Sequence, residues 1–184
     1  MIETERLILR HWLESDADAL YSYASDPEIG PVAGWPPHTS VENSLEIIRT
    51  VFAAPEVYAV VLKSTGQPVG SCGLMFPDSI NVGAMPAAEA EIGYWIGKPY
   101  WGKGLIPEAV NALLTHGFED MHLDAIWCGH YDGNHKSKRV CEKCGFIYHH
   151  VNRDVTSPLG DIRTEHFYRM TASDYRSLHP LKHY

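Results

Sequence analysis

A short turn between two apolar runs constrains the fold of this chain more than any other feature. The run VYAVVLK (57–63) is rich in β-branched and aromatic residues, the turn STGQ (64–67) follows it, and the chain returns as PVGSCGLM (68–75). Two strand-like runs separated by so short a turn predict a β-hairpin, in which the neighbouring strands are antiparallel. A sheet that holds such a pair differs from the all-parallel sheet of a doubly wound domain, so the hairpin favours a mixed sheet.

Strand and helix signals continue on both sides of the hairpin. The other strand-like runs are RLILRHW (6–12), AEIGYWI (90–96), LDAIWCGHY (123–131), FIYHH (146–150) and TEHFYRM (164–170). Helix signals lie after Ser15, over 41–52, over 109–121 and over 137–145. The expected order is therefore β-α-α-β-β-β-α-β-α-β-β. Because no linker or internal repeat interrupts it, we expect one domain over residues 1–184.

Two polar pairs predict where the first two helices begin. Ser15 and Asp18 have the spacing of a capping box ahead of the first helix, and Thr39 and Glu42 have it ahead of the second. The Pro- and Gly-rich stretch between these helices, residues 26–39, is expected to be a long loop.

The acidic balance of the chain limits its partners. The formal net charge is −8 with the histidines neutral, and such a surface repels phosphate backbones, so nucleic-acid binding is disfavoured. An amine or a cationic peptide suits it better. The N-terminus lacks a signal-peptide core, and no apolar run is long enough to span a bilayer. We therefore expect a cytoplasmic protein with no membrane partner, in which the cysteines are reduced thiols.

The stretch PYWGKGLIPEA (99–109) combines two glycines with the expected start of a helix. A nucleotide-binding P-loop needs Ser or Thr after its Gly-Lys pair, but Lys103 is followed by Gly104 and Leu105. The dinucleotide glycine fingerprint fails on spacing. The free N–H groups of a helix that begins near Gly104 can instead receive a pyrophosphate. From the glycines alone, a tight turn without a ligand is the favoured interpretation.

The blocks TERLILRHWLESDADALY (4–21), AEIGYWIGKPYWGKGLIPEA (90–109) and GNHKSKRVCEKCGF (133–146) together resemble the GCN5-related N-acetyltransferases, the GNAT family. Within that family they look most like the branch of the ribosomal-protein N-terminal acetyltransferases. The resemblance implies an α/β fold with a mixed, mostly antiparallel sheet flanked by helices. It also implies that the sheet is splayed between its fourth and fifth strands and that acetyl-CoA lies in the gap.

The resemblance assigns acetyl-CoA to three groups of residues. They are the backbone of Tyr94, Trp95 and Ile96, the pyrophosphate loop Trp101, Gly102, Lys103, Gly104, Leu105 and Ile106, and the pair Asn134 and Ser137. The loop departs from the family pattern, in which Arg or Gln stands in place of Trp101 and a small residue in place of Ile106. Asn134 and Ser137 have an alternative role in the turn and as the cap of the next helix. A basic cluster either contacts a CoA phosphate or forms a solvated helix face: Lys136, Lys138 and Arg139.

Acetyl transfer to an amine needs a group that removes a proton and benefits from one that protonates the departing thiolate. By resemblance Glu91 is the base, acting through water; the alternative is an exposed carboxylate at a strand end, or one that only attracts a cationic substrate. Many relatives place a tyrosine where this chain has Cys141. Cys141 can donate a proton, or its side chain can simply fill the inner face of a helix. Tyr131 and Tyr148 are further candidates for a hydroxyl donor.

One cysteine pair raises the alternative of a zinc site. Cys141 and Cys144 are spaced as CxxC, and Cys128 and His130 precede them. A single CxxC is incomplete as a zinc site, and Cys144 stands where the family usually has an apolar residue. Core packing is therefore the favoured interpretation of these cysteines, and we expect no metal.

The sequence thus predicts an acetyl-CoA-dependent N-acetyltransferase that transfers the acetyl group directly, in a ternary complex, to a primary amine. The acceptor is either a protein N-terminus or a small amine, bound by residues from the expected loops 26–39, 77–88 and 151–163. The alternative is a degenerate relative that binds CoA as a regulatory or structural ligand without transfer. Dimers are common in the resembled family, so a homodimer is compatible with this interpretation.

Overall fold

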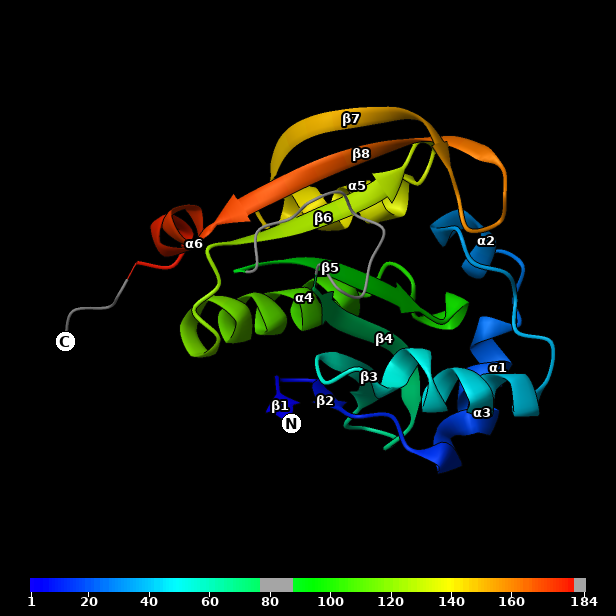
Figure 1. Ribbon diagram of the computed structural model, residues 1–184. Helices are drawn as coiled ribbons and strands as arrows, with labels where there is room; N and C mark the ends of the chain where they lie inside the picture. Colours follow the sequence, from blue (N-terminus) through cyan, green and yellow to red (C-terminus); the bar gives the residue numbers. More distant parts are fainter. Residues whose placement is uncertain (77–87, 181–184) are drawn as a thin grey trace.

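The computed structural model describes residues 1–76 and 88–180, and the strands of these residues form one eight-stranded sheet. The strands are β1 (Ile2–Glu3), β2 (Leu7–Arg10), β3 (Val57–Leu62), β4 (Pro68–Met75), β5 (Glu89–Ile96), β6 (Ala125–Tyr131), β7 (Ile147–Thr156) and β8 (Ile162–Thr171). Their order across the sheet is β1-β2-β3-β4-β5-β6-β8-β7 (Figure 1). The predicted hairpin is the β3–β4 pair, which is antiparallel.

The strand directions divide the sheet in two. Every neighbouring pair is antiparallel except β5 and β6, which run parallel. Their pairing covers only the first half of β5, from Glu89 opposite Ala125 to Ile92 opposite Cys128. Beyond those residues the two strands no longer pair, so the sheet is splayed there. This mixed, mostly antiparallel sheet confirms the predicted fold class. The fourth and fifth predicted strands are β5 and β6 because the short β1 was not predicted.

Helices flank the sheet on both faces. The α-helices are α1 (Ala17–Ala24), α2 (Gly30–Ala33), α3 (Val41–Arg49), α4 (Leu105–Thr115), α5 (His135–Lys143) and α6 (Ala172–Leu178). Short 3-10 turns lie at Glu14–Asp16, Val51–Ala53 and Lys98–Tyr100, and a π-helical turn at His116–Asp120 extends α4. Within residues 1–76 and 88–180, no helix has both the length and the apolar character that crossing a membrane requires.

Alternation along the strands separates two apolar cores. On β3, Tyr58 and Val60 pack in the core that contains the buried residues of α4 and α5, whereas Ala59 and Val61 pack in the core of α1 and α3. In Figure 1, α1 and α3 lie beside the β3–β4 part of the sheet, and α5 lies with β6, β7 and β8. The sheet thus has one surface that carries α4 and α5 and an opposite surface that carries α1 and α3.

The structure corrects two of the predicted loops. Residues 26–39 contain the short helix α2, which has a proline in its first turn and ends at Gly34 with φ of 91°. Most of 151–163 belongs to β7 and β8, so only residues 157–161 connect these strands. The predicted loop 77–88 lies outside the described residues except for its last position.

Both predicted helix caps were wrong by one or two positions. Asp16, rather than Asp18, accepts a hydrogen bond from the Leu13 N–H at 2.9 Å, and Arg10 holds its carboxylate at 2.7 Å. Ser40, rather than Thr39, is the N-cap of α3, because its extended backbone lets its side chain accept the N–H of Asn43. The helix ends at Arg49, earlier than the predicted position 52.

Candidate active site

The unpaired half of β5 presents backbone groups to the gap beside β6. The N–H of Gly97 donates to the carbonyl of Val69 at 2.8 Å, so the backbone groups of Gly97 point toward β4. Because the backbone groups of alternate residues point to opposite neighbours, those of Trp95 face β4, and those of Tyr94 and Ile96 face the gap. The structure therefore brings Tyr94 and Ile96, of the predicted cofactor contacts, to the gap and turns the backbone of Trp95 away from it.

The predicted pyrophosphate loop follows β5 and leads into α4. Gly102 and Gly104 have φ of 73° and 74°, in the left-handed region that glycine tolerates best. Gly104 is the N-cap of α4, and a Cβ added there would meet only an Arg6 nitrogen within 4 Å, at 3.7 Å. The first N–H groups of a helix have no carbonyl partner within it and carry the positive end of its dipole. This end of α4 can therefore accept an anionic group.

Arg6 holds this loop in shape from the N-terminal part of the chain. Its Nη1 donates to the carbonyl of Lys103 at 2.9 Å, and its Nη2 pairs with Glu108 of α4 at 2.6 Å. Glu108 also accepts a hydrogen bond from Thr4 Oγ1 at 2.6 Å. This role could not be predicted from the sequence, because Arg6 and Glu108 lie 102 positions apart and belong to no common motif.

Trp101 joins the loop to both sides of the gap. Its indole N–H donates to the carbonyl of Ile96 at 3.0 Å, and the ammonium group of Lys136 on α5 lies 3.2 Å from the centre of its ring. The carbonyl of Ile96 is then satisfied. Within the described residues, the N–H of Ile96 and both backbone groups of Tyr94 lie beyond the end of the β5–β6 ladder. A tryptophan in place of the family's Arg or Gln thus has a structural reason here.

The remaining side chains of the loop divide between core and solvent. Leu105 and Ile106 are only 4% and 6% exposed and pack in the core, so the bulk of Ile106 points away from the loop surface. Lys103 is exposed, and its ammonium group lies 5.4 Å from the ring centre of Tyr100. The loop therefore offers a ligand its backbone N–H groups and the charge of Lys103.

Asn134 and Ser137 lie across the gap at the start of α5. Asn134 is the N-cap of this helix, and its Oδ1 accepts the N–H of Ser137 at 3.2 Å. The hydroxyl of Ser137 lies 2.8 Å from the hydroxyl of Tyr94. The side chain of Tyr94 therefore bridges from β5 to α5, a contact that the sequence did not predict.

Two buried thiols lie next to this bridge. Cys128 of β6 and Cys141 of α5 have no exposed surface, and their Sγ atoms are 3.0 Å apart. The Tyr94 hydroxyl is 3.5 Å from the first and 3.8 Å from the second. The hydrogen bond between Cys128 and Cys141 lowers the pKa of Cys141, whereas burial raises the pKa of Tyr94 well above its ordinary value. Tyr94 thus places a protonated hydroxyl beside Cys141, the predicted proton donor.

The cysteines pack as part of the α4–α5 core. Cys144 is 4% exposed, and its Sγ lies 3.9 Å from the carbonyl of Pro107 on α4. In the part of the chain that the structure describes, no group of three or more His, Cys, Asp or Glu side chains can hold a metal ion.

Two carboxylates meet on the opposite face of the sheet. Glu91 of β5 and Glu165 of β8 flank Gly129 of β6, where an added Cβ would lie 3.3 Å from Glu91 Oε1 and 3.4 Å from Glu165 Oε1. Burial raises the pKa of Glu91 to about 7, and the charge of Glu165 adds to the rise. Burial also raises the pKa of Glu165. A carboxyl that titrates near neutral pH suits a general base, so the predicted Glu91 has the required chemistry. Glu165 was not predicted.

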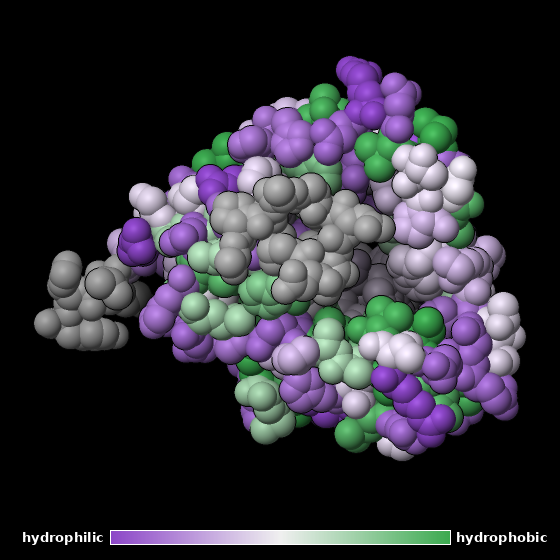
Figure 2. Space-filling view, viewed as in Figure 1, coloured by the Kyte–Doolittle hydropathy of each residue, from purple (hydrophilic) through white to green (hydrophobic). Residues whose placement is uncertain are grey.

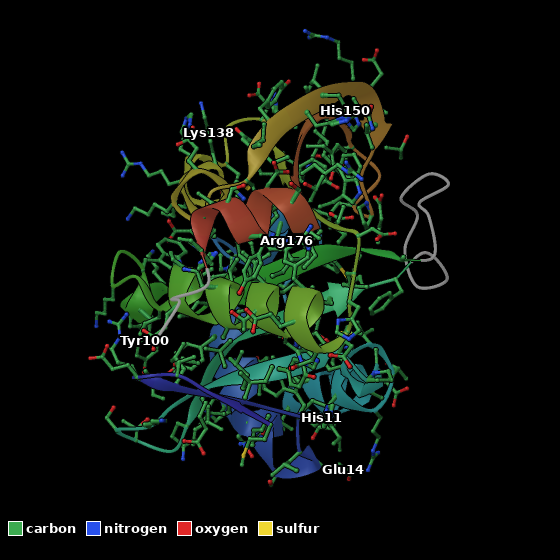
Figure 3. All side chains as sticks on the ribbon, turned by 90° about the vertical axis from the view of Figure 1, so that its left-hand side faces the viewer. His11, Glu14, Tyr100, Lys138, His150 and Arg176 are labelled. Atoms are coloured by element: carbon green, nitrogen blue, oxygen red, sulfur yellow. The ribbon has the colours of Figure 1, made fainter. Side chains whose placement is uncertain are left out.

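The two halves of the site lie on opposite faces of the sheet. Figure 3 shows Tyr100, beside the loop, and Lys138 of α5 toward one side of the molecule, and His150 of β7 toward the other. His150 stacks on Phe167 at 5.0 Å, and Phe167 is the register partner of Gly129. Figure 2 shows the surface recessed between the part formed by β6–β8 and the part with α1 and α3. The predicted cofactor residues and the two carboxylates are therefore separated by the sheet.

The two other tyrosine candidates lie in different surroundings. A Cβ added to Gly34 would lie 2.8 Å from the ring of Tyr131, so this tyrosine lies against residues 26–39. Tyr148 is half exposed on the outer strand β7, with its ring 5.3 Å from that of Tyr168.

Comparison with known proteins agrees with this geometry. Residues 6–147 match the family model described as an acetyltransferase (GNAT) domain. An uncharacterized N-acetyltransferase, p20 of Bacillus licheniformis, is 29% identical over 177 residues, which cover 94% of this chain and 96% of that protein. A putative ribosomal N-acetyltransferase of Bacillus subtilis, YdaF, is 42% identical over 89 residues, which cover 48% of this chain and 45% of that protein. The crystal structure of a GNAT-family acetyltransferase from Bacillus anthracis superposes with a TM-score of 0.81 at 23% identity, covering 94% of this chain and 98% of that one.

Proposed function

The chain belongs to the acetyltransferase (GNAT) domain family, and from that premise we propose that it transfers the acetyl group of acetyl-CoA directly to the amine of a protein N-terminus. The observation that carries the proposal is the splay between β5 and β6. There the N-terminus of α4 on one face and an ionisable carboxylate on the other reach the same gap.

The residues around the gap fit acetyl-CoA, the co-substrate of this family. A pyrophosphate suits the N–H groups of Leu105 and Ile106 at the start of α4, with Lys103 and Lys136 beside it. The amides of an extended pantetheine can pair with the free backbone groups of Tyr94 as an added strand would. Acetyl-CoA supplies the thioester that the amine attacks.

Two side chains near the gap carry out the two proton transfers, one each. An amine attacks only as the neutral base, so its proton must leave first, and Glu91 accepts it directly or through water. Tyr94 keeps its own proton at neutral pH and is the donor for the departing thiolate. Cys141, the sequence candidate for that role, then acts only by positioning the hydroxyl of Tyr94. An ionisable Glu91 at the gap supports transfer over mere CoA binding.

The choice of a protein N-terminus over a small amine rests on the relatives. One of them is named a putative ribosomal N-acetyltransferase. A cytoplasmic location belongs to the same proposal, because ribosomal proteins are made and assembled there. A homodimer stays a prediction, which sedimentation of the purified chain tests.

An acetylation assay with defined peptides tests the proposal. The purified chain is incubated with acetyl-CoA and peptides that begin with Ala, Ser or Met, and mass spectrometry locates any added acetyl group. We expect acetylation of the α-amine and release of CoA in equal amounts. Acetylation of small amines such as spermidine, with none on the peptides, would refute the N-terminal acceptor; no transfer to any amine would refute the proposed function.

A further inference from the structure

Glu91 and Glu165 are partly buried carboxylates that the surrounding protein leaves without a counter-charge. Among the described residues, neither carboxylate takes part in a hydrogen bond or an ion pair. In contrast, the carboxylate of Glu89, two residues before Glu91 on the same face of β5, has partners. It accepts a hydrogen bond from the indole of Trp127 and pairs with Arg169 Nη2 at 2.6 Å. Burying an unpaired carboxylate is costly. Because Glu91 and Glu165 lack, within residues 1–76 and 88–180, the arginine partner that Glu89 has, a bound cation would stabilise their ionised forms.

Gly129 keeps the space between the two carboxylates open. A Cβ there would lie 3.3 Å from Glu91 Oε1, 3.4 Å from Glu165 Oε1 and 3.2 Å from an edge carbon of the Phe167 ring. Any side chain at this position would therefore fill the space in which these three groups converge. Gly129, Glu91 and Glu165 are all only partly buried, so each of them keeps some exposed surface.

The neighbouring arginine does not neutralise Glu165. Arg163, two residues earlier on β8, pairs with Asp161 at 2.8 Å and donates to the carbonyl of Pro31 at 2.8 Å. Its guanidinium carbon lies 4.8 Å from the ring centre of Tyr131, which is the register partner of Glu165. Arg163 therefore ties residues 26–39 to the sheet, and its charge is already engaged.

Aromatic side chains lie on the same face of the sheet as the two carboxylates. Tyr131 contacts Gly34 of the segment 26–39, and the ring of the adjacent Trp35 lies 5.8 Å from that of Trp95. Trp95 is on the same face of β5 as Glu91, since alternate residues of a strand share a face. Carboxylates beside aromatic rings are the usual surroundings of a bound ammonium group.

We propose that the acceptor binds as its ammonium ion between Glu91 and Glu165, and that Glu165 is an acceptor-binding residue of the enzyme. This inference rests on the proposed function and narrows its substrate class to amines that arrive charged, such as a protein α-amine or an aliphatic amine. Arylamines, which are neutral at physiological pH, are excluded. The bound ammonium gives one proton to Glu91 and becomes the neutral amine, while Glu165 stays ionised and holds the acceptor in place.

Calorimetric titration with matched ligands tests this proposal without acetyl transfer. The peptide pair is tetra-alanine amide with a free α-amine and the same peptide with an acetylated, neutral N-terminus. The non-peptide pair is benzylamine, which is charged, and aniline, which is not. Each ligand is titrated into the wild type, into Glu165→Gln, and into Glu46→Gln, which removes the same charge from an exposed position on α3. Acetyl-CoA is titrated into each protein separately.

We expect the wild type and Glu46→Gln to bind the charged member of at least one pair about tenfold or more tightly than the neutral member. Glu165→Gln should lose that preference while its affinity for acetyl-CoA is unchanged, and in the transfer assay it should raise KM for the amine more than it lowers kcat. Equal binding within both pairs, no binding of either charged ligand, or a preference that survives in Glu165→Gln would overturn the proposal. Because acetyl-CoA binding is measured independently, loss of the cofactor site would be told apart from loss of the ammonium site.

Discussion

Glu91 differs from an ordinary surface carboxylate because burial and the nearby Glu165 bring its pKa to about 7. A general base must be ionised, so the rate of transfer should rise with pH through this range. Glu91→Gln should lower kcat about 10²-fold and remove the inflection near pH 7 from the profile of kcat/KM. The profile is measured from about pH 5 to about pH 9 with saturating acetyl-CoA. An inflection that survives in the variant would show that another group is the base.

The same pKa predicts an effect on stability that needs no substrate. The unfolded carboxyl titrates near its ordinary 4.5, whereas the native one titrates near 7. Between these values the native state binds more protons, so the free energy of unfolding falls as pH rises. Above about pH 7, Glu91→Gln should therefore be more stable than the wild type by on the order of 1–3 kcal/mol, and below about pH 4.5 this gain should vanish.

Glu89→Gln should destabilise the protein, in contrast to Glu91→Gln, because the charge of Glu89 is paired. Its carboxylate is buried against Arg169 and Trp127, so Glu89→Gln would leave a partly buried guanidinium without its partner. We expect a loss of about 2–4 kcal/mol in the free energy of unfolding, measured by urea denaturation. Glu14→Gln is the control, since Glu14 pairs with Arg49 on the open surface. Equal losses in both variants would mean that the buried Glu89 pair contributes no more to the free energy of unfolding than the exposed Glu14 pair.

Among individual residues, the sequence predicted those whose role depends on neighbours along the chain. Gly104 at the start of a helix and the polar pair Asn134 and Ser137 are of that kind. Arg6 and Glu165 could not be predicted, because each acts on a residue from a distant segment. The hydroxyl of Tyr94 was missed for the same reason, since only the fold brings it to Ser137 and Cys141.

Among the helices, the start of α3 gives the clearest test. Ser40 caps the helix through the N–H of Asn43 at 3.0 Å, whereas Thr39 uses only its own N–H, which donates to Asn43 Oδ1. Ser40→Ala should lower the free energy of unfolding by about 1 kcal/mol, and Thr39→Ala should change it much less. Thermal denaturation of both variants decides between them. A larger loss of stability for Thr39→Ala would show that Thr39 is the N-cap, as the sequence predicted.

The element boundaries show what periodicity can and cannot predict. Apolar spacing indicated α1 and α3, and further helix signals in the sequence indicated α4 and α5. Adjacent polar residues compete as caps, however, and only the backbone conformation selects one. The short β1 and α2 have too few residues to carry a pattern. β1 forms by pairing with β2, and the segment of α2 is tied to β6 and β8 by contacts of Gly34 and Pro31.

At the scale of the molecule, the two cores share one sheet. Neighbouring residues of β3 enter opposite cores, so neither core can lose its packing without exposing the other. We therefore propose that the chain is a single domain and expect one unfolding transition in urea, with coincident curves from tryptophan fluorescence and far-UV circular dichroism. Two separated transitions would contradict this view.

The order of elements and the mixed sheet followed from the hairpin and the runs around it, because these signals are local. The splay followed only from the family resemblance, since no pattern in β5 or β6 shows where their pairing ends. The meeting of two carboxylates across Gly129 was beyond the sequence altogether. It depends on the register of three strands, one of which lies near the end of the chain.

The central claim is that acetyl-CoA binds at the splay with its pyrophosphate at the start of α4. Calorimetric titration of acetyl-CoA into the wild type, Gly104→Trp and Gly66→Trp tests it most directly. Gly66 is the matched control, because its φ of 69° imposes similar backbone strain in a turn where an added Cβ meets nothing within 4 Å. We expect binding at about micromolar Kd for the wild type and Gly66→Trp, and none for Gly104→Trp. Absence of binding to the wild type, or equal binding to Gly104→Trp, would contradict the account.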